Sequence, residues 1–91
     1  MFESNKVKVD NKERFKGLQK MFKSLGFNLI AYSPSIFFED TFVFETDEEA
    51  KKAFIMFEGL EIFQGWWYGK EQFVNKVMKD YPNAQVIWLQ K

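Results

Sequence analysis

The stretch TFVFETDEEAKKAFIMFEG, residues 41–59, predicts a strand that leads directly into a helix. Its first residues are aromatic and β-branched, which is typical of strands. Thr46 and Glu49 have the spacing of a capping box, in which the cap side chain and the acid three positions later each accept a backbone N–H bond at the helix start. Gly59 suits a helix stop. We therefore expect a helix over 47–58.

The same reasoning extends to the rest of the chain. Residues that are apolar at every second position, or short runs that are apolar throughout, predict strands, and apolar residues three or four positions apart predict helices. Segment 36–45 is either one strand with a bulge near Glu39 and Asp40 or a tight hairpin that turns there. The expected elements are a strand over 4–9, a helix over 11–25, strands over 27–32 and 36–45, the helix over 47–58, a strand over 60–67, a helix over 70–81 and a strand over 84–89. This order predicts a single α+β domain over residues 1–91, a ferredoxin-like βαββαβ sandwich with an additional C-terminal helix and strand.

Several classes of function lack their characteristic residues. The 91 residues include no cysteine and no histidine, so thiolate chemistry, disulfides and histidine bases or zinc ligands are excluded. The glycines form no nucleotide-binding pattern, and we expect no cofactor and no resident metal. No apolar run approaches the roughly 20 residues that span a bilayer, and the N-terminus lacks the apolar core of a signal peptide. We expect a cytoplasmic, non-enzymatic protein without a membrane partner.

Charge is sorted along the chain although the formal net charge is zero. Residues 1–26 carry seven basic and three acidic side chains, a net of +4, whereas residues 39–61 carry two basic and eight acidic side chains, a net of −6. A nucleic-acid-binding domain is the alternative function, and it would use the basic face of the first helix and the lysines before it as a phosphate track. Its residues are Lys6, Lys8, Lys12, Lys16, Lys20 and Lys23. The other interpretation of this face is the solvated side of an amphipathic helix, which we favour.

Three carboxylates allow a second alternative, an acidic metal enzyme that uses Asp40, Glu45 and Glu49. Glu49 and Lys51 have the E-x-K spacing of some magnesium-dependent nucleases, whose acids converge on the metal. However, both residues fall inside a capped helix, where this composition is ordinary for a solvated face. We therefore favour the helical surface.

The strand and helix of residues 41–59 resemble the third strand and second helix of an RNA recognition motif, over about 20 residues. The basic residue and glycine that precede the strand aromatics in that family are missing, because Phe38, Glu39, Asp40 and Thr41 stand before Phe42. Acids at this place would repel phosphates. The resemblance therefore implies a shared topology rather than RNA binding.

Aromatic residues are the main functional signal, with 12 Phe, 3 Trp and 3 Tyr in the chain. Side chains alternate between the faces of a strand, so Trp66 shares a face with Ile62, and Trp67 shares the other with Phe63. We expect the Trp66 face to pack under the first two helices, with Trp66 and Trp88 mostly core. The position of the third helix determines whether the Trp67 face is buried. If this helix packs on that face of the sheet, the aromatic rings there are core; if the helix lies beside the sheet, the rings stay exposed.

An exposed ring cluster would mark an interface, because monomers seldom leave large apolar patches uncovered. We expect a protein-binding domain that acts as an adaptor, as an inhibitor or as a homodimer. A phage-encoded inhibitor is one example of this class. Its partner would be another protein or a second copy of the chain. The predicted contact surface is an aromatic patch with an acidic rim, made of Phe37, Glu39, Glu45, Glu61, Phe63, Trp67 and Tyr68.

Overall fold

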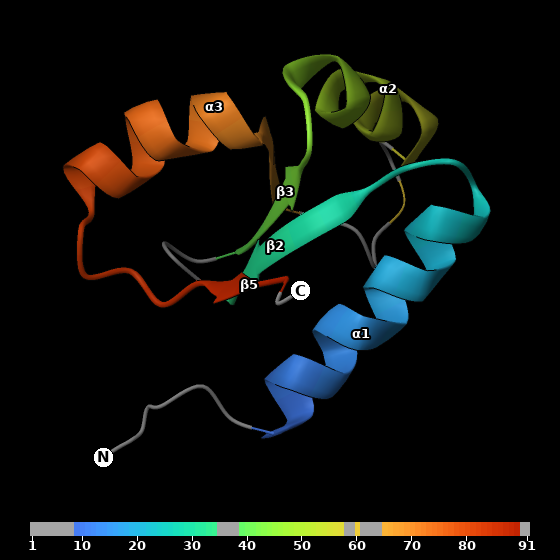
Figure 1. Ribbon diagram of the computed structural model, residues 1–91, viewed down its shortest axis with the longest axis horizontal. Helices are drawn as coiled ribbons and strands as arrows, with labels where there is room; N and C mark the ends of the chain where they lie inside the picture. Colours follow the sequence, from blue (N-terminus) through green and yellow to red (C-terminus); the bar gives the residue numbers. More distant parts are fainter. Residues whose placement is uncertain (1–8, 35–38, 58–59, 61–64, 90–91) are drawn as a thin grey trace.

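The computed structural model describes residues 9–34, 39–57, 60 and 65–89 as a mixed α+β protein (Figure 1). Its elements are α1 (Val9–Ser24), β2 (Leu29–Ser33), β3 (Asp40–Phe44), α2 (Asp47–Phe57), β4 (Gly65–Gly69), α3 (Lys70–Gln72), the π-helix η2 (Phe73–Met78) and β5 (Ile87–Trp88). The helical conformation continues from η2 to residue 80, and we call residues 70–80 the third helix. Among the described residues, no helix is long and apolar enough to span a membrane.

The helix ends follow from local sequence. Gly26 ends α1 with a φ of 91°, a left-handed conformation that glycine adopts at little cost. The N–H of Phe27 bonds the Phe22 carbonyl at 2.8 Å and the N–H of Gly26 bonds the Lys23 carbonyl at 3.0 Å, which together form a Schellman motif. The helices expected over 11–25 and 47–58 are thus confirmed, to within about two residues. Of the first expected strand, residues 4–8 lie outside the described residues and Val9 is helical.

The four described strands form one sheet in the order β4-β3-β2-β5. β2 pairs antiparallel with β3 and with β5, whereas β3 and β4 are parallel neighbours joined through α2. A ferredoxin-like sheet is built on split βαβ units, in which another strand separates the two strands of the unit. Direct pairing of β3 with β4 leaves no such gap, so the α+β class is confirmed and the ferredoxin-like order is not.

The described sheet has a register irregularity in β2. Leu29 is opposite Phe44 and Ala31 is opposite Val43, so Ile30 is the extra residue. Residues 40–44 form one uninterrupted strand, and residues 35–38, where a hairpin would have its first arm, lie outside the described residues.

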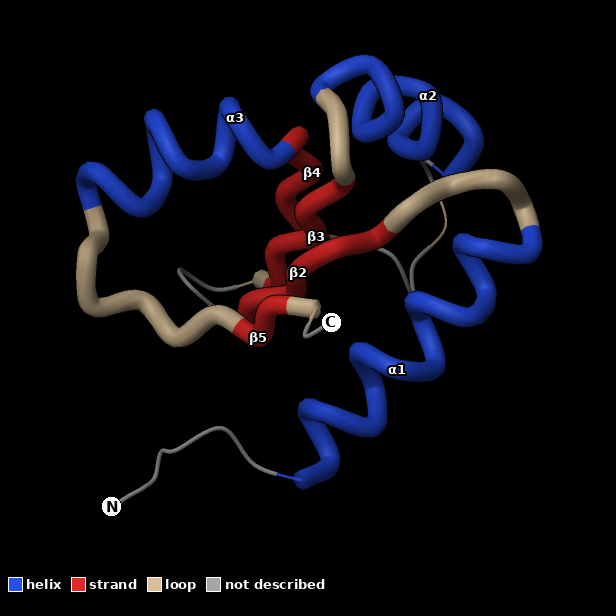
Figure 2. Tube along the Cα trace, viewed as in Figure 1, coloured by secondary structure: helices blue, strands red, loops and turns tan. Residues whose placement is uncertain are grey.

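Helices cover both faces of the sheet, with α1 and α2 on one side and the third helix on the other (Figure 2). The first side buries Phe15 and Phe22 of α1 and Ala50 and Ala53 of α2. The second side buries Phe73 and Val77 of the third helix together with Ala31 and Val43 of the sheet. This explains why consecutive residues of β2 are apolar, because helices pack against both of its faces.

The third helix contains a π-helical segment, which changes the residues that share its buried side. A π-helix bonds residue i to i+5 and therefore has a wider turn than an α-helix. Phe73, Val77 and Met78 pack toward the sheet as expected. Val74 and Tyr81, which the α-helical spacing also predicts on that side, are 42% and 45% exposed.

Candidate functional site

The predicted aromatic patch is not brought together in the described residues. Trp67 packs into the core between the sheet and the first two helices, with ring centroids 4.8 Å from Phe42, 5.8 Å from Phe44 and 6.0 Å from Phe22. Tyr68 is half-buried on the opposite face, 6.1 Å from Phe73. Both residues were expected as contact residues of one patch, and they lie on opposite faces of the sheet.

The acidic rim is not brought together either. Glu39 and Glu45 are exposed, but they flank β3 at its two ends, roughly 20 Å apart along an extended chain. Three further residues of the prediction lie outside the described residues: Phe37, Glu61 and Phe63.

Trp66 was expected in the core and is instead 45% exposed. It is opposite Thr41 in the register of β3 and β4, whereas Trp67 is opposite Phe42, which faces α1 and α2. The alternation of side chains was predicted correctly, but the two faces were exchanged. Because Trp66 shares its face with Tyr68, it lies on the side of the third helix.

The exposed apolar surface lies on α2 instead. Phe54, Ile55 and Met56 are consecutive and are 44%, 61% and 54% exposed. Residues on an α-helix are 100° apart, so three in a row cannot all face one core, and the core-facing positions of α2 are occupied by Ala50 and Ala53. The signal for this surface in the sequence is Ile55, an apolar residue on the charged side of the helix expected over 47–58.

A groove of about 550 Å³ separates this part of α2 from β4 and the start of the third helix, and we call it the β4 groove. Its rim carries one acid, Asp47, and one base, Lys51. The other lining residues are mostly apolar or neutral: Ala50, Phe54, Gly65, Trp66, Trp67 and Gln72. Such a rim has no strong preference for a cationic or an anionic ligand.

β4 is an edge strand of the described sheet, and its own sequence lacks two common features that protect such edges. Natural edge strands are commonly blocked by charged residues or proline, because their free N–H and C=O groups can pair with another chain. The sequence of β4, GWWYG, contains neither. A Cβ at Gly65 would overlap the Asp40 carbonyl oxygen, so glycine is needed there for close approach of β4 to β3.

The basic face of α1 borders a second groove, of about 330 Å³, which we call the β5 groove. Lys12, Lys16 and Gln19 form its helical wall, and the remaining lining residues are Phe15, Ile87, Trp88 and Leu89. Lys20 and Lys23 are exposed farther along the same side of α1. Lys6 and Lys8 lie outside the described residues.

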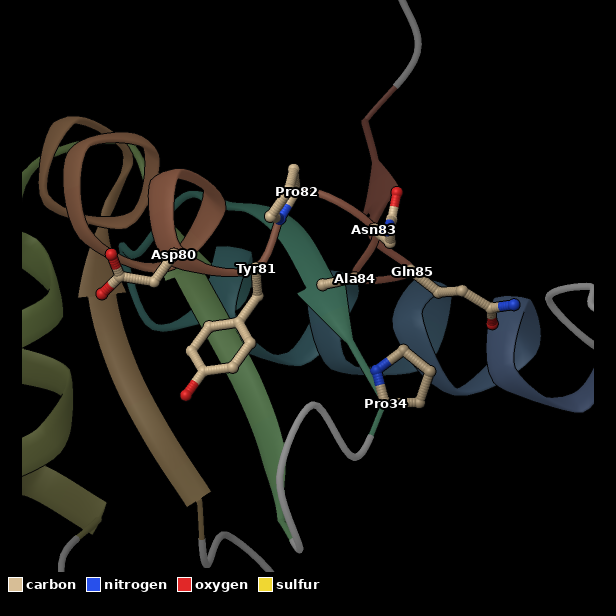
Figure 3. Close-up of a pocket in the computed structure, with 7 residues that line it drawn as sticks. All are labelled: Pro34, Asp80, Tyr81, Pro82, Asn83, Ala84 and Gln85. Carbon is tan, nitrogen blue, oxygen red and sulfur yellow. The ribbon is translucent and has the colours of Figure 1, made fainter.

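A third hollow, of about 450 Å³, lies beside the loop after the third helix (Figure 3). The ring of Tyr81 lies on one side of it and Pro34 on the other. Ser33 Oγ donates to the carbonyl of Gln85, which fixes this loop to β2. Asp80 and Tyr81 are the ionisable side chains among the lining residues of this hollow.

A polar cluster joins α1, β2 and β3. The Tyr32 hydroxyl donates to Asp40 Oδ2 at 2.6 Å and accepts from Arg14 Nε at 3.1 Å, and Arg14 Nε lies 3.4 Å from the same carboxylate. Burial raises the pKa of Tyr32, and the bond to Asp40 raises it further, with Arg14 acting in the opposite direction. The neutral hydroxyl is therefore favoured, and the cluster satisfies a buried polar group.

The three acids of the metal-enzyme alternative do not converge. Glu49 Oε2 accepts from the N–H of Asn28 at 3.0 Å, and Asn28 Nδ2 donates to Glu45, so these two acids lie near one end of β3. Asp40 lies at the other end with Arg14 and Tyr32. The part of the chain that the structure describes contains no group of three potential metal ligands.

Comparison with protein-family models, with curated proteins and with solved structures finds no match for this chain. The surfaces themselves are therefore the basis for inference about function.

Proposed function

We propose that this chain is a non-enzymatic protein-binding domain that binds a second copy of itself through the β4 groove. The observation that carries the proposal is the pair of exposed apolar side chains that line this groove at an edge of the described sheet: Phe54 on α2 and Trp66 on β4. Phe, Trp and Met are enriched in protein interfaces, and Trp is a frequent hot spot.

The apolar surface has a substantial free energy to gain by burial. Covering one large apolar side chain stabilises a complex by up to about 1.5–3 kcal/mol, and Phe54 and Trp66 are each nearly half exposed. In a symmetric dimer both subunits contribute these side chains, so four of them would be covered. A moderate gain in free energy per side chain therefore suffices for micromolar association.

A second copy suits β4 because GWWYG is nearly the same in both directions. Antiparallel pairing about Trp67 would place Gly65 opposite Gly69 of the partner subunit and Trp66 opposite the partner's Tyr68. Aromatic cross-strand pairs stabilise such pairing, and the terminal glycines leave room at both ends. Charge supports the same occupant, because the single Asp47 and single Lys51 of the rim can each meet the opposite charge of the partner.

The test is the mass of the protein in solution, measured by analytical ultracentrifugation between about 1 µM and 500 µM. We expect a monomer–dimer equilibrium that Trp66→Lys weakens at least about tenfold, because a charge on an edge strand opposes pairing. Phe54→Glu, on the α2 side of the groove, should have the same effect. Val74→Lys is the matched control, since Val74 is 42% exposed on the third helix and does not line the groove.

Circular dichroism and the melting temperature of each variant as a monomer separate loss of association from loss of folding. A wild-type protein that stays monomeric at 500 µM would overturn the proposal. So would folded Trp66→Lys and Phe54→Glu variants that associate as strongly as Val74→Lys.

A further inference from the structure

We infer that the β5 groove, at the opposite edge of the described sheet, binds an extended acidic segment of another protein, which adds to β5 as a strand. This site is separate from the β4 groove, and no residue lines both. Three observations support it: the charge of the groove wall, the direction of the backbone groups of β5, and the packing of the Trp88 ring against Phe73.

The helical wall of the groove is basic. Lys12, Lys16 and Gln19 are spaced i, i+4 and i+7, which places them along one side of α1. Lys20 and Lys23 extend the same side. Among the described residues that line the groove there is no acid, so carboxylates are the complementary charge.

The backbone of β5 offers a strand-pairing position. The N–H of Leu89 donates inward to the carbonyl of Ile30 at 2.7 Å. Neighbouring residues in a strand direct their N–H and C=O groups to opposite edges, so those of Trp88 point away from β2. In the part of the chain that the structure describes, β5 has a partner strand on the β2 side only. An extended peptide can therefore bond Trp88 from outside, which is the geometry of strand addition.

The floor of the groove selects for a peptide rather than a nucleic acid. Single-stranded nucleic acids are held by bases that stack on exposed aromatic rings. The Trp88 ring is packed against Phe73, 5.9 Å away on the far face of the sheet, so it does not offer such a platform. Phe15, Ile87 and Leu89 instead form an apolar floor suited to aliphatic side chains.

Side chains of an added strand alternate between the two faces of the sheet. Those on the α1 face would meet the apolar floor and the two lysines, so the segment should combine Asp or Glu with aliphatic residues. Residues 1–8 of the chain carry Lys6 and Lys8 against one acid, Glu3, so charge does not favour them as the occupant.

The test uses a fluorescent peptide in which Glu alternates with Val and Leu over eight residues, flanked by Gly-Ser for solubility. Its binding is measured by fluorescence anisotropy at two salt concentrations, and the amide of Trp88 is followed by NMR. We expect binding that weakens as salt rises. We also expect the Trp88 N–H to become protected from hydrogen exchange. The same peptide with Lys in place of Glu should not bind.

Lys12→Glu/Lys16→Glu is the decisive variant, and it should weaken binding by at least about tenfold because two attractions become repulsions. Lys76→Glu/Lys79→Glu on the third helix makes the same change of net charge away from the groove and should stay within about twofold of the wild type. The Trp66→Lys variant should bind the peptide unchanged, so failure of the β4 proposal would not affect this result.

Three outcomes would overturn the inference. The first is no binding of the acidic peptide at 1 mM. The second is equal loss in the two double variants, which would indicate a general charge effect. The third is tighter binding of a twelve-nucleotide oligothymidine than of the peptide. If that binding also requires Lys12 and Lys16, it would identify a nucleic-acid surface.

Discussion

At the scale of single residues, Tyr32 illustrates how burial and hydrogen bonding act together. Its side chain is 1% exposed, yet its hydroxyl has both a donor and an acceptor partner from other elements. A buried hydroxyl without partners would destabilise the fold. Arg14 and Asp40 therefore stabilise the core through their hydrogen bonds to Tyr32, although both reach the surface.

Tyr32→Phe should change how stability depends on pH. The unfolded tyrosine has a pKa near 10, and the folded value is higher. Below pH 10 both states hold the proton and stability is constant; above pH 10 the unfolded state loses its proton first, so stability falls by up to about 1.4 kcal/mol per pH unit. The variant lacks this fall and should lose about 1–2 kcal/mol at neutral pH through the missing hydrogen bonds.

Urea unfolding at pH 8, 9, 10 and 10.5 measures both effects. Burial also raises the pKa of Tyr68, but that residue is present in both proteins, so its contribution cancels in the comparison. Parallel stability curves for wild type and variant would show that the proton on Tyr32 is not linked to folding.

The two adjacent tryptophans show what a sequence can predict about single residues. Alternation requires Trp66 and Trp67 to lie on opposite faces, and they do. Which face meets α1 and α2 depends on the partner strand: Trp67 is opposite Phe42, and Phe42 packs against those helices. That register is a long-range property, so local pattern could not assign the faces.

At the scale of elements, the start of α2 was predicted from Thr46 and Glu49, and half of the predicted capping box is present. Thr46 Oγ1 accepts from the N–H of Glu49 at 3.1 Å. The Glu49 carboxylate does not return to Thr46 but accepts from the N–H of Asn28, ahead of β2. A local motif has thus become a link between two elements, and spacing alone does not reveal this choice of partner.

Thr46→Ala should destabilise the protein by about 1 kcal/mol, because one backbone N–H at the start of α2 loses its acceptor. Thr46→Ser keeps the hydroxyl oxygen and should retain most of the stability. Thermal unfolding of the three proteins at one concentration measures the difference. If serine costs as much as alanine, the threonine methyl group rather than the cap would be responsible.

The order of helices and strands along the chain was predicted better than the pairing of the strands in the sheet. Helix-forming and strand-forming segments were located along the chain from their periods, but β3-α2-β4 forms a parallel pair of adjacent strands. The same strand–helix–strand sequence fits a split unit equally well, since both connect parallel strands through a helix on one face. The choice depends on which strands pair across the sheet, and no local residue in β3 or β4 encodes it.

At the scale of the whole molecule, the two grooves lie at opposite edges of the described sheet, the β4 groove beside α2 and the β5 groove beside α1. These two helices cover the same face of the sheet (Figure 2). The β4 groove is apolar with a mixed rim, and the β5 groove has a basic wall. If two copies pair through β4, the strands run from β5 of one subunit to β5 of the other. Each dimer would then present two acidic-segment sites at its far ends.

This arrangement predicts avidity for a bivalent ligand. Each bound peptide adds one strand outside β5, so ten strands would stand in a row and the two peptides would lie nine spacings apart, about 43 Å at 4.8 Å per spacing. Two copies of the acidic peptide joined by about 60 Gly/Ser residues have an r.m.s. reach near that distance, whereas a five-residue linker cannot span it. We expect the long tandem peptide to bind wild-type protein at least about tenfold more tightly than the single peptide.

The short tandem peptide should show no such gain, and Trp66→Lys should abolish the gain of the long one while leaving single-peptide binding intact. Anisotropy at protein concentrations above the dimer dissociation constant provides the measurement. A gain that persists in the Trp66→Lys variant would mean that the two sites are joined other than through β4. Equal gains with both linkers would place the sites much closer together than a sheet extended through β4 allows.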